Sequence, residues 1–166
     1  MARVNQSVGN PLSLNLRDAT SSDEAFLIAL YSSTRKEEVA LWGWPAVAQE
    51  AFLRTQARTQ QQAYAMQFPR VEHLIIETAG RAIGRMLVDR SGNEIHLVDI
   101  SLLPEQRGQG VGTALLGTLL DEGRRSQRPV GLRVARSNRA HSLYVRLGFV
   151  AIDEDSMYIT MRWSPC

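Results

Sequence analysis

The sequence predicts a single α/β domain in which helices flank a mixed β-sheet. The chain has 166 residues, a length that suits one domain with a sizeable core. Strand-like and helix-like segments alternate along it, and no repeat or linker interrupts them. A glycine-rich turn joins an apolar strand at residues 95–103 directly to an amphipathic helix that begins at Val111. We therefore expect residues 1–166 to fold as one domain, with residues 1–11 as a loose polar lead-in.

The first half of the chain is predicted to hold a strand, two helices and a β-hairpin. Alternation of leucines with polar residues indicates the strand, and apolar residues at helical spacing indicate the helices. Trp42-Gly43-Trp44-Pro45 separates the two helices, because glycine and proline both interrupt a helix. Residues 34–40, just before this break, fit no element clearly. The expected elements are a strand at 12–17, a helix that begins after Ser21 or Ser22, a long helix at 46–66, and hairpin strands at 71–78 and 82–88.

The second half is predicted to hold the glycine turn between a strand and a helix, then another strand and helix, then two short strands. Ser91-Gly92-Asn93 turns the chain into the strand that precedes the glycine turn. The helix after the glycine turn ends near Arg124 and Arg125, whose charges suit the negative end of the helix dipole. Gly148 ends the last helix. The expected ranges are a strand at 94–102, a helix at 111–125, a strand at 130–135, a helix at 139–147, and strands near Val150 and at 158–162.

Composition and charge exclude several classes of protein. The 19 basic residues, of which 18 are arginine, are interspersed with 17 acidic residues, and the net charge is +2. This pattern lacks the basic stripe that nucleic-acid binding needs. No apolar run approaches the ~20 residues of a membrane span, and the N-terminus lacks the apolar core of a signal peptide. We therefore expect a cytoplasmic protein that binds neither nucleic acid nor a membrane. Cys166 is the only cysteine, which excludes an intrachain disulfide and makes a cysteine nucleophile a poor candidate.

The glycine turn has the features of an anion-binding site. Gly108, Gly110 and Gly112 allow a ligand to approach the backbone closely, and Arg107 adds a cationic donor. The first N–H groups of the following helix have no partner inside the helix, and the helix dipole places partial positive charge there. A phosphate group is therefore the expected ligand.

Two common phosphate-binding motifs do not fit this turn. A P-loop has Lys and then Ser or Thr after its last glycine, whereas Thr113 follows Gly112 here and the only lysine is Lys36. A dinucleotide-binding loop has a third glycine where this chain has Thr113. It also has an acidic residue about 20 positions later, and residues 131–134 contain none. A nucleoside triphosphate and NAD are therefore disfavoured.

A third pattern fits the turn: Arg, two residues, Gly, one residue and Gly, as Arg107, Gly110 and Gly112. A second segment, residues 137–149 (SNRAHSLYVRLGF), follows at a suitable distance. Together the two segments resemble the GNAT acetyltransferase superfamily, whose downstream motif is Asn-x-x-Ala-x-x-Leu-Tyr-x-x-x-Gly-Phe. The residues that match this downstream motif are Ala140, Leu143, Tyr144, Gly148 and Phe149.

The resemblance implies a fold, a cosubstrate and a set of binding residues. The implied fold is a mixed, mostly antiparallel central sheet flanked by helices. The implied reaction transfers an acetyl group from acetyl-CoA to a primary amine by direct attack in a ternary complex, without a metal. Leu102 and Leu103 offer backbone groups to the pantetheine arm. Ser137 takes the place of the family's asparagine, so Asn138, one place later, is the candidate for its hydrogen bond to the cofactor. The residues implied for the pyrophosphate are Arg107, Gly108, Gln109, Gly110, Val111, Gly112 and Thr113.

Three residues are candidates for proton transfer. Tyr144 matches the family's tyrosine and is the candidate general acid, because a phenol with a pKa of ~10 can protonate the departing thiolate of a thiol with a pKa of ~8.5. The acceptor amine needs a base, and Asp99 and His96 are equal candidates for it. Strict strand alternation puts them on opposite faces, but a bulge, which the family often has here, leaves the facing open. Asp99 has apolar neighbours, so we expect it either to pair with an arginine or to serve function.

The sequence does not identify the acceptor amine. The resemblance implies that it binds against residues 31–68, where Trp42 and Trp44 either line a groove or pack against the long helix. Homodimers are common in the family, and no residue of this sequence indicates one. The alternative function is a CoA-binding module that has lost turnover and acts as a sensor or an interaction subunit. The displaced asparagine supports this alternative, and Tyr144 argues against it.

Overall fold

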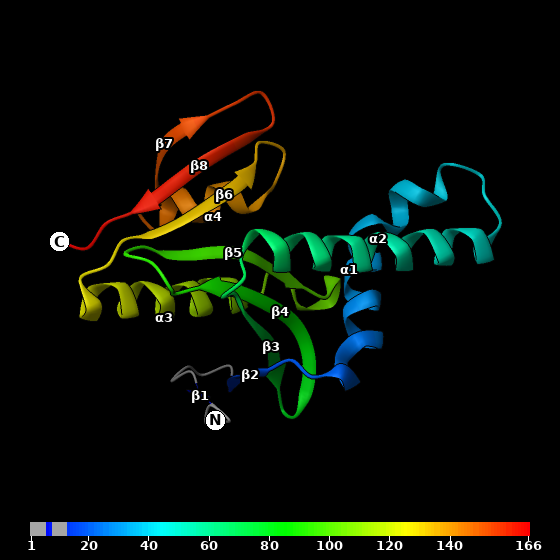
Figure 1. Ribbon diagram of the computed structural model, residues 1–166, viewed down its shortest axis with the longest axis horizontal. Coiled ribbons are helices and arrows are strands. Elements are labelled where there is room, and N and C mark those ends of the chain that lie inside the picture. Colours follow the sequence, from blue (N-terminus) through cyan, green and yellow to red (C-terminus); the bar gives the residue numbers. More distant parts are fainter. Residues whose placement is uncertain (1–5, 8–12) are drawn as a thin grey trace.

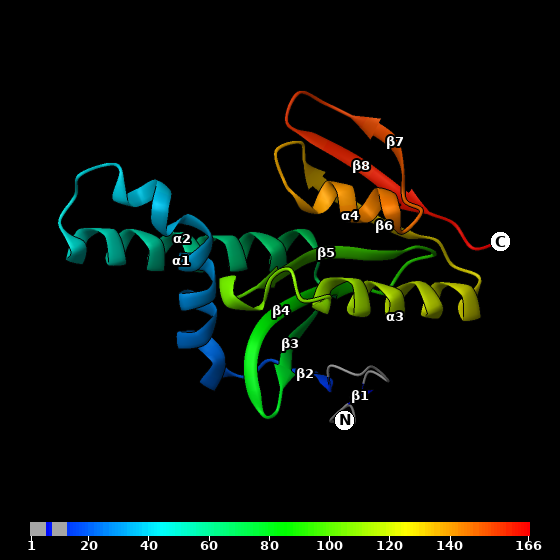
Figure 2. The ribbon, with the colours of Figure 1, turned by 180° about the vertical axis from the view of Figure 1, so that it is seen from behind.

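The computed structural model describes residues 6–7 and 13–166, whose strands form one eight-stranded sheet with the order β1-β2-β3-β4-β5-β6-β8-β7. All neighbouring strands are antiparallel except β5 and β6, which are parallel. Helices α1 and α2 cover one face of the sheet, and α3 and α4 cover the other, as the front and back views show (Figures 1 and 2). The predicted fold class, a mixed and mostly antiparallel sheet flanked by helices, is confirmed.

The observed elements follow the predicted ones closely along the chain. Residues 34–40 belong to the first helix, and within this charged stretch Val39 is fully buried. In the predicted lead-in, residues 6 and 7 pair with the next strand, while the remainder of residues 1–12 lies outside the described residues. The strands are β1 (Gln6–Ser7), β2 (Leu14–Asp18), β3 (Glu72–Thr78), β4 (Arg81–Asp89), β5 (Ile95–Leu102), β6 (Val130–Ala135), β7 (Val150–Glu154) and β8 (Tyr158–Trp163). The helices are α1 (Glu24–Ala40), α2 (Ala46–Gln67), α3 (Val111–Ser126) and α4 (Ala140–Arg146), with short 3-10 turns η1 (Ser21–Asp23) and η2 (Pro104–Gln106).

The sheet has an apolar core on each side, because successive residues of a strand face opposite ways. On the α3 side, Met86 and Val88 of β4 belong to a large cluster with Leu115 of α3. On the α1 and α2 side, Leu87 is buried at 3% exposure. Charged side chains are therefore costly on either face of β4 unless they are paired.

The pairing of β4 with β5 contains a bulge that changes which way β5 faces. Leu97 is opposite Val88, but Asp99 is opposite Leu87, so Val98 has no partner of its own. Directly opposed residues of an antiparallel pair share a face of the sheet. Asp99 therefore lies on the α2 face, although strict alternation would put it with Leu97 in the core beside α3.

The parallel strands β5 and β6 separate partway along their length. They pair only from Ile95 to Leu97 on β5 and from Val130 to Leu132 on β6. Both strands continue, β5 to Leu102 and β6 to Ala135, without pairing to each other (Figure 1). This separation opens the sheet in its middle, next to the glycine turn.

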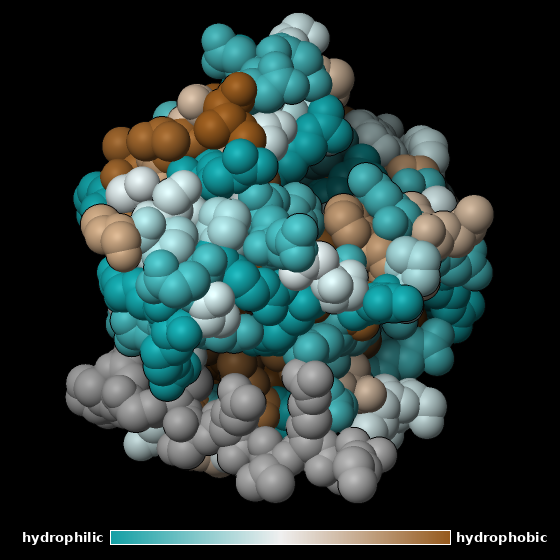
Figure 3. Space-filling view, turned by 60° about the vertical axis from the view of Figure 1, so that its left-hand side comes forward, coloured by the Kyte–Doolittle hydropathy of each residue, from teal (hydrophilic) through white to brown (hydrophobic). Residues whose placement is uncertain are grey.

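The surface is polar, with scattered apolar side chains. Hydrophilic side chains cover most of the face shown in Figure 3, and the hydrophobic ones gather in small patches. Within residues 6–7 and 13–166, no helix has the length and apolar character needed to cross a membrane. The same residues contain no cluster of His, Cys, Asp or Glu suited to a metal ion.

Candidate functional site

The glycine turn presents free backbone donors to solvent. Gly108 and Gly110 have φ angles of +71° and +82°, and a Cβ atom on either would meet nothing within 4 Å. Gly110 is the N-cap of α3 and no side chain caps the helix there. The first N–H groups of α3 are therefore available, and the positive end of the helix dipole adds to their attraction for an anion.

Alanine substitution should affect stability differently at Gly110, which has a left-handed backbone, and at Gly112, which has a helical one. Gly110→Ala forces a side chain into the left-handed region, and we expect it to lower the free energy of unfolding by about 1–2 kcal/mol. Gly112 has helical backbone, and a Cβ there lies at an ordinary 3.6 Å from Leu143 Cδ2. Gly112→Ala should therefore be neutral or raise stability by up to about 1 kcal/mol. Urea denaturation of both variants is the measurement, and equal losses would contradict this account of the turn.

Arg107 and Leu102 meet where β5 enters the turn. Arg107 is exposed, and its Nε donates to the carbonyl of Leu102 at 3.1 Å. The N–H of Leu103 donates to the Ile83 carbonyl at 2.9 Å and thus points toward β4. Neighbouring residues of a strand point their backbone N–H and C=O groups in opposite directions. The backbone groups of Leu102 therefore point away from β4, toward the opening, and those of Leu103 do not. Gln109 is also placed at this turn, where its Nε2 donates to the Glu105 carbonyl.

Tyr144 lies on α4 and belongs to the core on the α3 side of the sheet. Its side chain is buried and packs edge-to-face on Phe149 with ring centroids 5.7 Å apart. Its hydroxyl makes no hydrogen bond within residues 13–166 and is not among their fully buried polar atoms. Burial, and secondarily the negative charge of Asp99, raises the pKa of Tyr144 to about 12. The phenol therefore stays protonated at neutral pH, with Asp99 near it.

One carboxylate oxygen of Asp99 accepts two hydrogen bonds, and the other accepts none from a described side chain. Its Oδ2 accepts hydrogen bonds from Arg85 Nε at 2.9 Å and from Ser101 Oγ at 3.0 Å. Its Oδ1 has no partner among the side chains that the structure describes, and its side chain is 21% exposed. The carboxylate is thus oriented by two donors, while one oxygen can still accept a proton or a hydrogen bond from a ligand.

Helix α2 provides a row of side chains that support this region. Gln60 Oε1 accepts a hydrogen bond from Arg85 Nη2 at 2.7 Å, and the Tyr64 ring lies 5.9 Å from the Arg85 guanidinium. Phe68 stacks on His96 at 5.2 Å. These α2 residues are spaced i, i+4 and i+8, so they share one face of the helix. Arg85 and Gln60 were not predicted from the sequence as site residues, whereas Tyr64 and Phe68 lie in the region at residues 31–68 that was expected to bind the acceptor.

His96 lies at the closed end of β5. It is opposite Gly131 in the segment where β5 and β6 still pair. Its Nδ1 is 3.8 Å from Glu94 Oε1, and Glu94 Oε2 accepts from Arg162 Nε at 2.7 Å. Asp99 thus lies beyond the point where β5 and β6 separate, close enough to Tyr144 for its charge to raise the pKa of the phenol, whereas His96 lies where the two strands still pair, on the same face of the sheet as Asp99.

Asn138 has a structural partner. Its Oδ1 accepts a hydrogen bond from the N–H of Ala140 at 2.9 Å, at the beginning of α4. An asparagine in this position satisfies one of the free donors of a helix start. The side-chain oxygen of the sequence-predicted cofactor ligand is therefore used within the protein.

The two tryptophans pack against the long helix. Trp42, Trp44 and Phe52 of α2 form a trio of edge-to-face contacts with ring centroids 5.2–5.6 Å apart. Their loop joins α1 to the beginning of α2, whereas Phe68, at the other end of α2, contacts β5 (Figure 1). Of the two alternatives left by the sequence, packing is the one observed.

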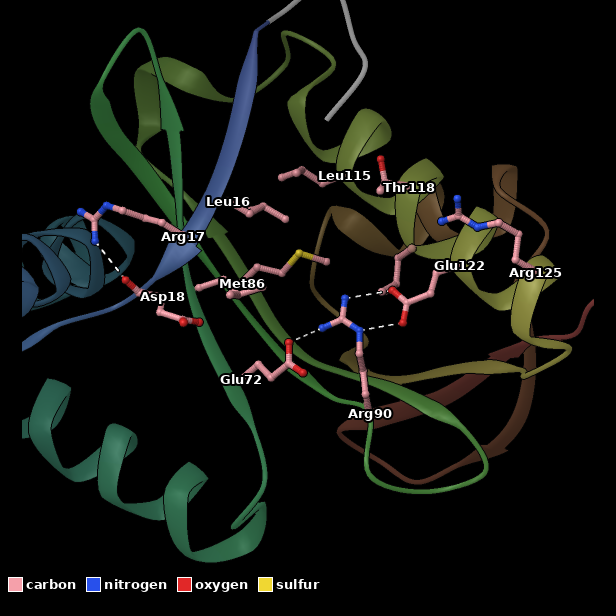
Figure 4. A pocket seen from close by; sticks show the side chains of 12 residues that line it. Leu16, Arg17, Asp18, Glu72, Met86, Arg90, Leu115, Thr118, Glu122 and Arg125 are labelled. Carbon is pink, nitrogen blue, oxygen red and sulfur yellow. Dashed lines mark hydrogen bonds and ion pairs between the residues drawn. The ribbon is translucent and has the colours of Figure 1, made fainter. Parts of the chain in front are cut away.

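A cavity of about 270 Å³ lies elsewhere, between β2–β4 and α3. Its floor is aliphatic, and at its rim Arg90 links Glu72 and Glu122 at 2.6 and 2.7 Å (Figure 4). Neither Asp99, Tyr144 nor any residue of the glycine turn lines it. This cavity is therefore separate from the opening between β5 and β6.

Comparison with known proteins points to one family. The family model described as an acetyltransferase (GNAT) domain matches residues 20–162. A PaiA N-acetyltransferase from Thermoplasma acidophilum, solved with coenzyme A, has a similar structure, with a TM-score of 0.67, 19% identity and coverage of 92% of this chain and 99% of that one. The ribosomal-protein-S18-alanine N-acetyltransferase of Escherichia coli gives a TM-score of 0.58 at 20% identity, covering 91% and 93%. At these identities the solved structures show a shared fold. A comparison with curated protein sequences gives no significant match.

Proposed function

The chain belongs to the GNAT family of acetyltransferases, and we propose that it transfers an acetyl group from acetyl-CoA to a primary amine by direct attack in a ternary complex. The observation that carries this proposal is the position of Asp99 on the separated part of β5, close enough to the buried Tyr144 for its charge to raise the pKa of that phenol. An acid for the departing thiolate and a base for the amine are what this reaction needs.

The residues of the turn fit the cosubstrate. A pyrophosphate needs several convergent donors, and the uncapped N–H groups from Gly108 to Thr113 supply them without a competing side chain. Arg107 adds a guanidinium, once it releases the Leu102 carbonyl. The freed backbone groups of Leu102 then face the separation of β5 and β6, where the extended pantetheine arm with its amides would lie. The acetyl group would thereby reach Tyr144 and Asp99.

In the proposed reaction the acceptor nitrogen loses two protons and the thiolate gains one. Asp99 Oδ1 accepts a proton from the acceptor ammonium, and the neutral amine attacks the thioester carbonyl. The C–S bond breaks, and Tyr144 donates its hydroxyl proton to the departing thiolate. The new amide nitrogen then releases its second proton, which restores the Tyr144 hydroxyl, and Asp99 returns its proton to solvent. Burial raises the pKa of Tyr144 to about 12, and the same environment raises the pKa of a buried thiol, so the acid and the leaving group shift in the same direction. His96 is the alternative base.

The approach of the two substrates follows from the layers of the fold. Tyr144 belongs to the core on the α3 side, whereas Asp99 lies on the α2 side. Acetyl-CoA would enter from the glycine turn, and the amine from the face covered by α2, with transfer through the opening between them. This arrangement keeps the acceptor apart from the pyrophosphate.

A thermal-shift comparison of acetyl-CoA, longer acyl-CoAs, NAD and ATP tests the proposal at the cosubstrate end. Acetyl-CoA at 100 times its dissociation constant should add ~2.7 kcal/mol to the free energy of unfolding. NAD and ATP should add much less, because the turn lacks the third glycine and the lysine of their motifs. If no CoA species stabilises the protein, the proposed function is wrong.

A second candidate function is a CoA-binding module without turnover. It is favoured by one observation, the use of the Asn138 oxygen to begin α4. Release of free CoA in the presence of a panel of amines separates the two functions. Turnover with any amine excludes the module, and stabilisation by acetyl-CoA without turnover on a broad panel supports it. The single-domain organisation of residues 1–166, the cytoplasmic location and a homodimer stay predictions.

A further inference from the structure

Three ion pairs of this protein join a guanidinium to both oxygens of one carboxylate. In one of them, Nε and Nη2 of Arg90 donate to the two oxygens of Glu122 at 2.7 and 3.0 Å. This two-pronged contact is a common geometry of an arginine beside a carboxylate, and it leaves neither oxygen without a donor. The three pairs are Arg17–Asp23, Arg35–Glu38 and Arg90–Glu122.

The pair formed by Arg85 and Asp99 has a different geometry. Arg85 Nε donates to Asp99 Oδ2 at 2.9 Å, but Arg85 Nη2 donates to Gln60 Oε1 on α2 at 2.7 Å. Nε and Nη2 are the same two nitrogens with which Arg90 holds Glu122. Gln60 therefore accepts the hydrogen bond that, in a two-pronged pair, would go to Asp99 Oδ1.

The burial of Arg85 gives this difference its importance. The Arg85 side chain is only 7% exposed, and a buried guanidinium N–H without an acceptor is costly. Without the Gln60 oxygen, Nη2 would need another acceptor. Asp99 Oδ1 belongs to the carboxylate that Nε already binds, so a guanidinium can reach it while the first hydrogen bond is kept.

We propose that Gln60 is a positioning residue that keeps Asp99 Oδ1 free for the acceptor amine, an inference that rests on the proposed function. A donor on a carboxylate favours its charged form, so a second hydrogen bond from Arg85 would make Asp99 a weaker proton acceptor. Gln60 removes this second donor, and as a neutral amide it adds no charge beside the base. Helix α2 thereby supports the chemistry through β4, without contact between Gln60 and the reacting atoms.

Steady-state kinetics of Gln60→Met test this role, because methionine matches glutamine in helix propensity and approximate size but lacks its oxygen. We expect kcat/KM at pH 7 to fall about tenfold, less than for loss of the whole base, while the affinity for acetyl-CoA stays unchanged. The deficit should shrink toward pH 9, where more of the amine is already neutral. The matched control is Gln62→Met, at an exposed α2 residue whose side chain makes no hydrogen bond within residues 13–166. It should stay within about twofold of the native enzyme.

A double-mutant cycle separates positioning from a structural defect. In an Asp99→Asn background, Gln60→Met should change kcat/KM less than about twofold, because no carboxylate is left for Arg85 to engage. The same tenfold loss in both backgrounds overturns the proposal. Gln60→Glu restores an acceptor for Arg85 Nη2 and should stay within about threefold of the native rate.

A crystal structure of Gln60→Met gives a readout that does not depend on turnover. Arg85 should then hold both oxygens of Asp99 through Nε and Nη2, and an Arg85 that still binds Oδ2 alone overturns the proposal. If Asp99→Asn is slow but Gln60→Met is as fast as the native enzyme, the role of Gln60 is wrong and the proposed function stands. If the native protein acetylates no amine, the proposed function fails, and the role of Gln60 fails with it.

Discussion

A Tyr144→Phe variant should turn over about 100-fold more slowly than the native enzyme and bind acetyl-CoA with unchanged affinity. The substitution removes the proton that the departing thiolate takes up, and loss of a general acid typically costs about 10²–10⁴-fold in rate. The ring itself stays, so the edge-to-face contact with Phe149 is kept. Because the hydroxyl makes no hydrogen bond within residues 13–166, its removal should leave the free energy of unfolding nearly unchanged.

Tyr64 provides the matched control for this variant. Burial, and then the charge of Asp99, raises its pKa to about 12 as well, but it lies on α2 on the opposite side of the sheet. Steady-state kinetics of Tyr64→Phe should show less than a threefold change in kcat. If Tyr64→Phe is the slow variant and Tyr144→Phe is not, the general acid has been assigned to the wrong tyrosine.

An Asp99→Asn variant should lower kcat/KM by about 10²–10³-fold at pH 7, because the amide cannot take a proton from the acceptor ammonium. A lysine-like amine has a pKa of about 10.4, so only a small neutral fraction is present at pH 7 and it rises about 100-fold by pH 9. The deficit of the variant relative to the native enzyme should accordingly shrink as the pH is raised. A pH profile of kcat/KM from 6.5 to 9.5 measures this.

Two measurements keep a structural effect of Asp99→Asn apart from a chemical one. The substitution leaves the buried Arg85 without its carboxylate, so urea denaturation and the affinity for acetyl-CoA must be recorded for the same variant. A purely structural defect would not be relieved by high pH. His96→Gln is the competing base variant, and a larger loss with it than with Asp99→Asn would transfer the role of base to His96.

The sequence predicted the elements well because their signals are local. Helix α2 was expected at residues 46–66 and runs from Ala46 to Gln67, since a Pro-Ala start and a Phe-Pro end mark it. Strand β6 was expected at residues 130–135 and is observed there. The extension of α1 through residues 34–40 was not predicted. This stretch is mostly charged, and its sequence does not show that Val39 is buried in the folded protein.

The site was predicted only where short motifs describe it. The glycine turn and Tyr144 belong to contiguous patterns, so their positions were readable from the chain. The role of Arg85 was not readable in this way. A single arginine in an apolar strand gives no local sign of its partner, and Asp99 comes beside it only when β4 and β5 pair. The positions of Asp99 and His96 relative to the opening depend on where β5 separates from β6, which is a property of the assembled sheet.

The bulge at Val98 changes which residues of β5 face the core beside α3. Before it, the odd-numbered Ile95 and Leu97 belong to the core beside α3, and after it the even-numbered Ile100 and Leu102 pack there. The same residues paired in strict alternation, without the bulge, would keep every side chain and still invert the site. The carboxylate of Asp99 would then enter the aliphatic core, and Val98 would take its place opposite Leu87 on the α2 face. The chemistry of this strand thus depends on its register as much as on the identity of its residues.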